Sequence, residues 1–238
     1  MLVANIATYP ARERNRREAF LSIAKQVDVL NVTLNEYSKV PRDLRRIENA
    51  NFYFPEENLK DVGKFSFNVG PEDDVFLCDD DIIYPDDYVS WLTRKRVELG
   101  SDDIVLGVHG VTYSDYYDGR KRSGRLVYEF NKSLSEGQFM NQLGTGTVHL
   151  KGKHLPQIEV MKGSSGFVDI RFARVLYEHG IPLFCIARDA GWLVEIENDV
   201  SLYLSVTSNL PMNALREVQT FGGLSKLPLI DSPLSMGY

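Results

Sequence analysis

The first part of the chain alternates between short apolar runs and an amphipathic stretch. Residues 2–7 are almost all apolar and are followed by Thr8-Tyr9-Pro10, which is typical of a buried strand and its loop. Residues 12–26 carry apolar side chains at helical spacing with charges opposite, which predicts an amphipathic helix. Residues 27–34 alternate between apolar and polar side chains, as a strand does. This order predicts a βαβ unit, which builds parallel sheets.

The same pattern continues through the rest of the first half. Residues 51–54 are a candidate third strand, and residues 75–78 are a clearer fourth that ends in three aspartates. A helix is predicted over 88–99, because Gly100 follows the last residue of its pattern. Residues 104–108 are apolar and predict another buried strand.

The second half mixes strands, a helix and an irregular end. Asp118-Gly119 is a turn signal between alternating segments, which predicts a hairpin or small antiparallel patch over 111–130. A helix is predicted over 166–179 and a strand over 183–187. Residues 209–238 are rich in small polar residues, Pro and Gly, so we expect a mobile loop or a tail packed on the body.

These elements predict an α/β fold in a single compact domain, which the length of 238 residues suits. Residues 1–108 form a doubly wound half with a mostly parallel sheet, and residues 109–238 form a mixed half. The net charge of −6 argues against nucleic acid as a partner, because binding nucleic acid requires a basic face.

The two cysteines and the apolar runs bear on location. Cys78 and Cys185 both lie in apolar stretches, so we expect buried thiols rather than a disulfide, as in a reducing compartment. No run approaches the ~20 apolar residues of a membrane-spanning helix, and the first residues do not resemble a signal peptide. We therefore expect a cytoplasmic protein, with peripheral association with the inner face of the membrane left open. The oligomeric state is not predicted.

Asp79, Asp80 and Asp81 follow directly on an apolar strand. Open α/β sheets bind ligands at the carboxyl ends of their strands, and three adjacent carboxylates repel one another unless a positive charge holds them. Mg²⁺ or Mn²⁺ takes oxygen ligands and is often shared with substrate phosphates, so the arrangement suits a metal–diphosphate site. The alternative is a solvated loop that precedes a helix N-cap at Asp86 or Asp87.

The segment Phe76–Tyr88, with its strand, Asp triplet and Tyr-Pro before a helix, resembles the D-x-D region of glycosyltransferases with the GT-A fold, particularly family-2-like bacterial enzymes. The resemblance covers roughly residues 1–195. Further blocks are similar in the same order: Ala7-Thr8-Tyr9-Pro10 with Arg12, Asp61-Val62-Gly63-Lys64-Phe65, Gly144-Thr145-Gly146-Thr147, Phe167-Val168-Asp169-Ile170 and Arg188-Asp189-Ala190-Gly191-Trp192-Leu193.

The resemblance implies roles for the acidic residues. Asp81 would be the main metal ligand, with Asp79 beside it facing the ribose or the donor sugar, and Asp80 would serve either purpose. Asp169 would be the general base of an inverting enzyme. Spacing alone favours a plainer explanation for Asp169, an aspartate at the N-terminus of a helix, where it meets the helix dipole.

The resemblance also implies a nucleotide site. Thr8 and Tyr9 would contact the nucleotide, and Gly146 would lie beside the donor sugar or form a plain turn. Other candidates carry charge. Arg12 and Lys64 would serve the nucleotide end, or be a first-turn helix residue and an exposed loop charge. Arg188 would meet the diphosphate, or pair with Asp189 or Asp199.

Together these roles imply a metal-dependent glycosyltransferase with Mn²⁺ or Mg²⁺ as cofactor. Its donor would be a nucleotide sugar, with UDP favoured, and its acceptor a saccharide or glycolipid in the synthesis of a surface polysaccharide or glycoconjugate. Residues 1–108 would bind the nucleotide sugar and residues 109–238 the acceptor.

Rival classes fit less well. A sugar-phosphate nucleotidyltransferase has a glycine-rich loop after the first strand, and Thr8-Tyr9-Pro10-Ala11 has no glycine. A haloacid-dehalogenase-like phosphatase has Thr or Val where Ile83 stands, and no G-x-G-x-x-G supports a dinucleotide-dependent oxidoreductase. A binding module for carbohydrate or nucleotide, with the fold but without turnover, stays open.

Overall fold

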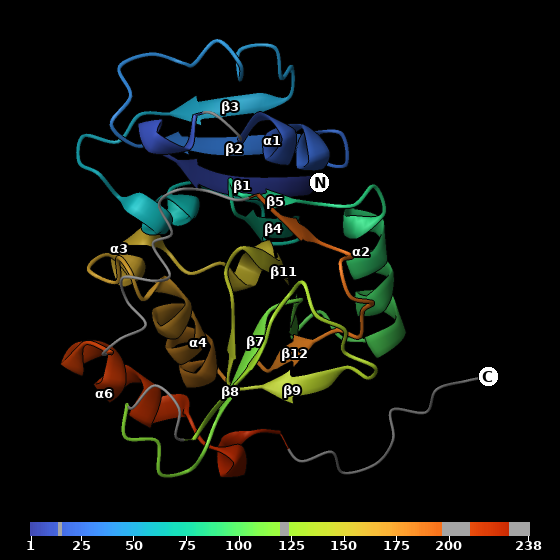
Figure 1. Cartoon of the computed structure of the whole chain (residues 1–238), viewed down its shortest axis with the longest axis vertical. Coiled ribbons are helices and arrows are strands. Elements are labelled where there is room, and N and C mark those ends of the chain that lie inside the picture. The colour runs from blue at the N-terminus through green and yellow to red at the C-terminus, as the bar shows by residue number, and fades with distance from the viewer. Residues whose placement is uncertain (14–15, 120–123, 197–209, 229–238) are drawn as a thin grey trace.

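A computed structural model describes residues 1–13, 16–119, 124–196 and 210–228. Its centre is an eight-stranded sheet in the order β3-β2-β1-β4-β11-β6-β12-β9, with helices on both faces (Figure 1). These strands are β1 (Leu2–Thr8), β2 (Val29–Leu34), β3 (Ala50–Tyr53), β4 (Asp74–Cys78), β6 (Val105–Gly107), β9 (Gln138–Met140), β11 (Thr147–Lys151) and β12 (Leu183–Cys185).

Most pairs in this sheet are parallel, which confirms the α/β fold expected from the sequence. Strand β1 pairs in parallel with β2 and β4, and β2 with β3. Strand β11 is antiparallel to both β4 and β6, whereas β6 and β12 are parallel. The insertion of β11 between β4 and β6 is what brings the second half of the chain against the acidic triplet.

Two small sheets and the helices complete the fold. The expected hairpin is confirmed as the antiparallel pair β7 (Gly110–Tyr113) and β8 (Arg125–Tyr128), although residues 120–123 of its connection lie outside the described residues. The other elements are β5 (Ile82–Ile83), β10 (Gln142–Leu143), β13 (Val194–Glu195), α1 (Arg16–Ala24), α2 (Tyr88–Leu99), α3 (Ile158–Met161), α4 (Val168–Glu178), α6 (Met212–Phe221), η1 (Pro10–Arg12), η2 (Lys60–Phe65), η3 (Gly152–His154) and η4 (Leu224–Lys226).

Alternating side chains of the central strands supply both cores. In β4, Phe76 and Cys78 belong to the apolar cluster that also contains buried residues of α1 and α2. Val75 and Leu77 point to the opposite cluster, under α4 and α6. Because side chains alternate along a strand, one short apolar run can anchor helices on both faces of the sheet.

Two of the three predicted helices agree with the structure. Helix α2 spans 88–99 as expected and ends at Gly100, whose φ of 63° is the left-handed conformation of a C-cap glycine. Helix α4 lies within the predicted 166–179. The helix predicted over 12–26 is shorter, since α1 starts at Arg16 and a 3₁₀ turn at Pro10–Arg12 precedes it.

Of the two alternatives expected for residues 209–238, a mobile loop or a tail packed on the body, residues 212–221 fit the packed tail. Residues 212–221 form α6, which packs on α4 and buries Ala214, Val218 and Phe221. The small and polar residues around it concealed a short amphipathic helix. Residues 229–238 lie outside the described part, as do 197–209.

The structure tests the expectations for the two cysteines and for membrane-spanning helices within the described residues. Cys78 and Cys185 are both buried and free, as predicted. None of the helices that the structure describes combines the length and the apolar character needed to cross a membrane.

Phe221→Ala should lower the free energy of unfolding by about 3–5 kcal/mol, because the Phe221 ring is 1% exposed between α6 and the body. Met212→Ala at the start of the same helix should change it by less than about 0.5 kcal/mol, since Met212 is 64% exposed. Urea unfolding of the two variants measures the difference. Equal effects would mean that α6 does not pack as described.

Candidate active site

The acidic triplet lies at the carboxyl end of β4, as the sequence predicts. The backbone there is fixed by Tyr84, whose hydroxyl accepts a hydrogen bond from Asp79 N at 2.8 Å and donates one to Gly146 O at 2.7 Å. Tyr84 is buried. A single hydroxyl group therefore joins the triplet to the segment that precedes β11.

Arg12 neutralises two of the three carboxylates. Its Nη1 lies 3.0 Å from Asp81 Oδ2, and its Nε lies 3.9 Å from Asp80 Oδ1. Asp80 is buried and also accepts a hydrogen bond from Thr8 Oγ1 at 2.6 Å. Burial disfavours the charged guanidinium, but Asp81 and Asp80 outweigh burial and raise the pKa of Arg12.

Lys64 neutralises the third carboxylate from η2. Its ammonium group forms an ion pair with Asp79 Oδ1 and lies 3.4 Å from the carbonyl oxygen of Thr145. Although burial opposes the charged form, the pKa of Lys64 is raised because of Asp79. The alternative of an exposed loop charge is wrong for Lys64, which is 2% exposed.

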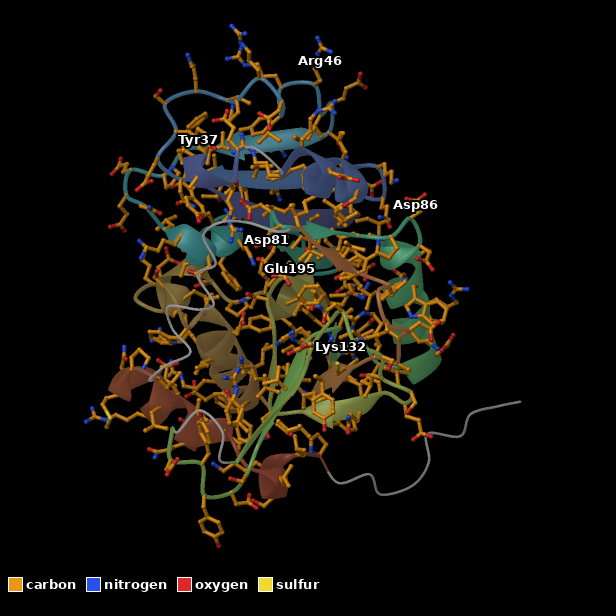
Figure 2. All side chains as sticks on the ribbon, in the orientation of Figure 1. Tyr37, Arg46, Asp81, Asp86, Lys132 and Glu195 are labelled. Atoms are coloured by element: carbon orange, nitrogen blue, oxygen red, sulfur yellow. The ribbon has the colours of Figure 1, made fainter. Side chains whose placement is uncertain are left out.

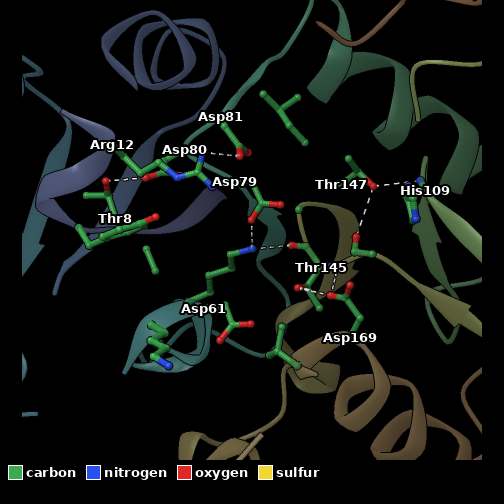
Figure 3. Close-up of a pocket in the computed structure, with 18 of the residues that line it drawn as sticks. Thr8, Arg12, Asp61, Asp79, Asp80, Asp81, His109, Thr145, Thr147 and Asp169 are labelled. Carbon is green, nitrogen blue, oxygen red and sulfur yellow. Dashed lines mark hydrogen bonds and ion pairs between the residues drawn. The ribbon is translucent and has the colours of Figure 1, made fainter. Parts of the chain in front are cut away.

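Asp169 lies in the first turn of α4, close to the same segment. Its Oδ1 accepts hydrogen bonds from Thr145 N at 2.8 Å and from Thr145 Oγ1 at 2.6 Å. Both bonds go to one oxygen, so Oδ2 has neither of these donors. The chain of contacts from Asp79 through Lys64 and Thr145 to Asp169 joins the acidic triplet to the predicted base (Figure 3).

These residues line one cavity of about 570 Å³. In the overall view, Asp81 and Glu195 lie close to each other near the middle of the molecule (Figure 2). Of the residues predicted from sequence to form the site, nine line this cavity: Thr8, Tyr9, Arg12, Lys64, Asp79, Asp80, Asp81, Gly146 and Asp169.

The backbone at Gly146 lies directly against the side chain of Asp79. A Cβ atom at this position would lie 1.9 Å from Asp79 Oδ2, which is far inside contact distance. Residue 146 must therefore be glycine if Asp79 is to keep its place. The close approach arises because β11 pairs with β4, with Thr147 opposite Cys78.

Arg188 is the predicted site residue that is not among those lining the cavity. Its Nη2 donates to the carbonyl oxygens of Tyr128 at 3.2 Å and Glu129 at 2.7 Å, and its Nη1 lies 3.3 Å from Ile186 O. Arg188 therefore braces the backbone after β8. Of its two suggested acidic partners, Asp199 lies outside the described residues.

Two histidines follow the segment 144–147, and both have partners elsewhere in the fold. His149 stacks on Phe76 with ring centroids 4.5 Å apart, and its Nε2 lies 2.9 Å from Asp74 Oδ1. His154 Nε2 lies 2.9 Å from Asp103 Oδ1. Neither lines the cavity.

The cavity is also lined by polar residues that sequence patterns did not select, among them Asp61, His109, Asn131 and Glu195. Glu195 reaches it because β13 pairs with β5, opposite Ile82. Asp61 belongs to the block Asp61-Val62-Gly63-Lys64-Phe65, whose resemblance implies a role for Lys64 alone. His109 and Asn131 lie in loops without a motif, so only the fold reveals them.

Several polar atoms of the lining are buried without a hydrogen-bond partner among the described residues. They are the hydroxyl oxygen of Tyr9, Nε of Arg12, Oδ1 of Asp61 and Oδ1 of Asn131. Unsatisfied buried polar atoms are costly, and in a cavity they are the groups that a polar ligand would satisfy.

Asp61, Asp80 and Asp81 carry raised pKa values, chiefly because of burial. Burial raises the pKa of Asp80 to about 6 and that of Asp61 to about 6. For Asp81, burial followed by the charge of Asp79 raises the pKa to about 7. Raised carboxyl pKa values indicate that the cavity favours additional positive charge.

The donor set suits a hard divalent cation only in part. Among described residues, no group of three or more His, Cys, Asp and Glu side chains is arranged to hold a metal. Asp79 and Asp81, with side chains 39% and 21% exposed, do present carboxylate oxygens to the cavity. Mg²⁺ is commonly held by one or two carboxylates together with substrate phosphates, and these two residues fit that mode.

Comparison with known proteins gives a match in structure only. No family model matches the chain, and no curated protein matches it in sequence. Solved structures do match. The crystal structure of S. aureus TarS 1–349 has a TM-score of 0.53 and 15% identity, over 80% of this chain and 59% of that one. A second crystal structure of S. aureus TarS has a TM-score of 0.49 and 14% identity, over 98% and 47%.

The chain therefore has a mixed α/β fold with a large, mostly parallel sheet, similar to the fold of TarS 1–349. It spans less than two thirds of the length of either TarS structure.

The raised pKa values of Asp61, Asp80 and Asp81 predict that stability falls as pH rises. Between the ordinary aspartate pKa of 3.8 and the value of about 7 for Asp81, the folded state binds more protons than the unfolded state. The ligand-free protein should therefore melt at a higher temperature at about pH 5 than at about pH 8. Asp81→Asn should make this dependence shallower.

Asp86→Asn is the matched control, because the side chain of Asp86 is 86% exposed and pairs with Lys25 at the surface. Melting curves of the three proteins across the pH range make the comparison. An unchanged slope in Asp81→Asn would contradict the assigned electrostatics.

Proposed function

We propose that the protein is a glycosyltransferase that moves a sugar from a nucleotide-sugar donor to a hydroxyl group of a saccharide or glycolipid. One observation carries the proposal: the acidic triplet and the carboxylate of Asp169 line the same cavity. The fold shared with TarS, a glycosyltransferase, supports the class. We also propose that the acceptor belongs to a surface polysaccharide or glycoconjugate.

The nucleotide belongs at the end of the cavity formed by the first strands. Thr8 and Tyr9 lie at the end of β1, and Asn35 follows β2, so these residues line the carboxyl edge of the parallel sheet. Ligands of open α/β folds bind at this edge. The Tyr9 hydroxyl and Asp61 Oδ1, unpaired among the described residues, are available to the polar atoms of a nucleoside. We favour UDP as the nucleotide.

The diphosphate of the donor would lie between the triplet and its cations. Arg12 and Lys64 bring positive charge there, and the developing charge of a leaving diphosphate needs such stabilisation. Asp79 and Asp81 would hold Mn²⁺ or Mg²⁺ together with the phosphates. Such a metal, when bound, would act as a Lewis acid towards the diphosphate oxygens.

Asp169 would act as the general base. The acceptor oxygen attacks the anomeric carbon, the bond from that carbon to the diphosphate oxygen breaks, and the electron pair leaves with the nucleoside diphosphate. The proton of the acceptor hydroxyl passes to the carboxylate of Asp169. Thr145 holds Oδ1, which leaves Oδ2 to receive it. A single displacement of this kind inverts the anomeric configuration.

A binding module without turnover is the second candidate. The charge pairs of Arg12 and Lys64 would stabilise the triplet in such a module without any ligand. Asp169 would then be a helix N-terminal residue that holds the segment at Thr145. Turnover of a donor separates the two candidates.

UDP with Mn²⁺ should raise the melting temperature of the wild-type protein. A ligand at about one hundred times its dissociation constant adds about 2.7 kcal/mol to the free energy of unfolding. Asp81→Ala should lose the metal-dependent part of this shift, whereas Asp86→Ala, at an exposed surface ion pair, should keep it. GDP, CMP and dTDP are measured beside UDP. A stabilisation by no nucleotide would contradict the donor site.

Asp169→Asn should lower sugar transfer about 10²–10⁴-fold, the usual contribution of general acid–base catalysis. The UDP-induced shift in melting temperature should stay, because the introduced amide keeps an oxygen for the two Thr145 donors. Transfer is measured as release of the nucleoside diphosphate, and the anomeric configuration of the product by NMR. Full activity of Asp169→Asn, or retention of configuration, would remove Asp169 as the base.

A further inference from the structure

The end of the cavity away from Thr8 is lined by residues with no role in the steps above. His109 lies in the connection between β6 and β7, and Glu129, Phe130 and Asn131 follow β8. In the close-up, His109 lies on the side of the cavity opposite Thr8 (Figure 3). Any ligand that reaches Asp169 from this side would meet these side chains.

The main chain of His109 is fixed to the segment before β11. Its N–H donates to Thr147 Oγ1 at 3.0 Å, and its carbonyl oxygen accepts from Gly144 N at 3.0 Å. The ring lies against Gly144, where an added Cβ would be 3.1 Å from His109 Cδ2. The position of the imidazole is therefore set by the segment from Gly144 to Thr147.

Asp169 is held by the same segment, through the two hydrogen bonds from Thr145. His109 and Asp169 thus share one support although they lie on different elements. Their charges also interact: burial lowers the pKa of His109, and the carboxylate of Asp169 is the charge that most opposes this effect. Arg125, Arg188 and Glu129 are the other charged groups that act on the ring.

The ring nitrogens of His109 are available to a ligand. Within the described ranges, neither makes a hydrogen bond, and the residue keeps part of its surface open to the cavity. Because burial lowers its pKa, the ring is neutral near pH 7. A neutral imidazole offers one donor and one acceptor, which is the complement of a hydroxyl group.

The neighbours of His109 suit a sugar. The ring of Phe130 is tilted 53° to that of His109 with centroids 6.1 Å apart, and it lines the cavity. Oδ1 of Asn131 is buried there and unpaired among the described residues. An aromatic ring together with a few convergent polar groups is the usual composition of a site for a small polar ligand with an apolar face.

We propose that His109, Phe130 and Asn131 form the acceptor subsite for a saccharide, in which His109 positions the nucleophilic hydroxyl towards Asp169. This assignment rests on the proposed function and adds the place and the residues of acceptor recognition. His109 is a positioning residue. It keeps its own proton throughout, because the hydroxyl proton passes to Asp169 and the sugar bond forms to the acceptor oxygen.

The test separates use of the donor from use of the acceptor. UDP-sugar donors are incubated with the enzyme alone and with a panel of methyl glycosides as probes, and release of UDP is measured. Release without a glycoside is hydrolysis of the donor by water, which needs only the donor site and Asp169. The increase on addition of a glycoside, divided by each variant's own rate of hydrolysis, reports the acceptor subsite.

In the wild-type enzyme, at least one methyl glycoside should increase UDP release. His109→Ala should lower this increase about tenfold, as expected for the loss of one hydrogen bond to a positioned hydroxyl, mainly through a higher KM for the glycoside. His109→Gln, which keeps a donor and an acceptor, should recover part of it. His154→Ala is the matched control, since His154 pairs with Asp103 outside the cavity.

The UDP-induced shift in melting temperature should persist in His109→Ala, which also shows that the variant is folded. Full stimulation of His109→Ala, or no stimulation of the wild type by any glycoside, would overturn the saccharide subsite. Absence of both nucleotide binding and donor hydrolysis in the wild type would instead overturn the proposed function, so the two failures are distinct.

Discussion

The neutralisation of three adjacent carboxylates by two buried cations is the interaction on which the site depends. Arg12 and Lys64 come from different elements; Arg12 pairs with Asp80 and Asp81, and Lys64 pairs with Asp79. A buried charge without its partner is strongly unfavourable, so neither cation can leave without cost. The loop after β1 and the turn η2 are thereby fixed against the end of β4.

The topology of the sheet connects this cluster of charges to Asp169. Because β11 is antiparallel to β4, the turn before β11 lies beside the aspartates that follow β4. That turn contains Thr145, which contacts Lys64 on one side and Asp169 on the other. The proposed diphosphate site and the proposed base are thus joined through one short segment. The pairing of β11 with β4 fixes the position of that segment, and with it the distance between the two sites.

The sequence predicts this site well where a local rule fixes the position of a residue. Asp79–Asp81 end an apolar strand, so their place at the sheet edge follows from the strand alone. Asp169 follows from a helix start, although only its resemblance to a known block suggested a catalytic role. For Arg188, the resemblance implied contact with the diphosphate or pairing with Asp189 or Asp199, whereas its guanidinium group donates to backbone carbonyl oxygens.

His109 and Asn131 escaped prediction for the opposite reason. Each lies in a loop, and only long-range pairing of strands brings them to the cavity. Helix α6 was missed for the same reason. Its short apolar stripe is buried only because α6 packs on α4, which is distant in the sequence. Local patterns predict the strands and the longer helices, but contacts between distant segments determine the second half of the site.

The hydroxyl of Tyr84 joins two segments that lie far apart in the chain, and Gly146 has no room for a side chain beside Asp79. Neither residue carries out a chemical step in the proposed reaction, yet each fixes its own segment against the other. In distant homologues the pair should be inherited together with the aspartates. A tyrosine five residues after the first aspartate, matched to a glycine before the antiparallel strand, is therefore a more discriminating signature of this site than an acidic run, which many unrelated loops contain.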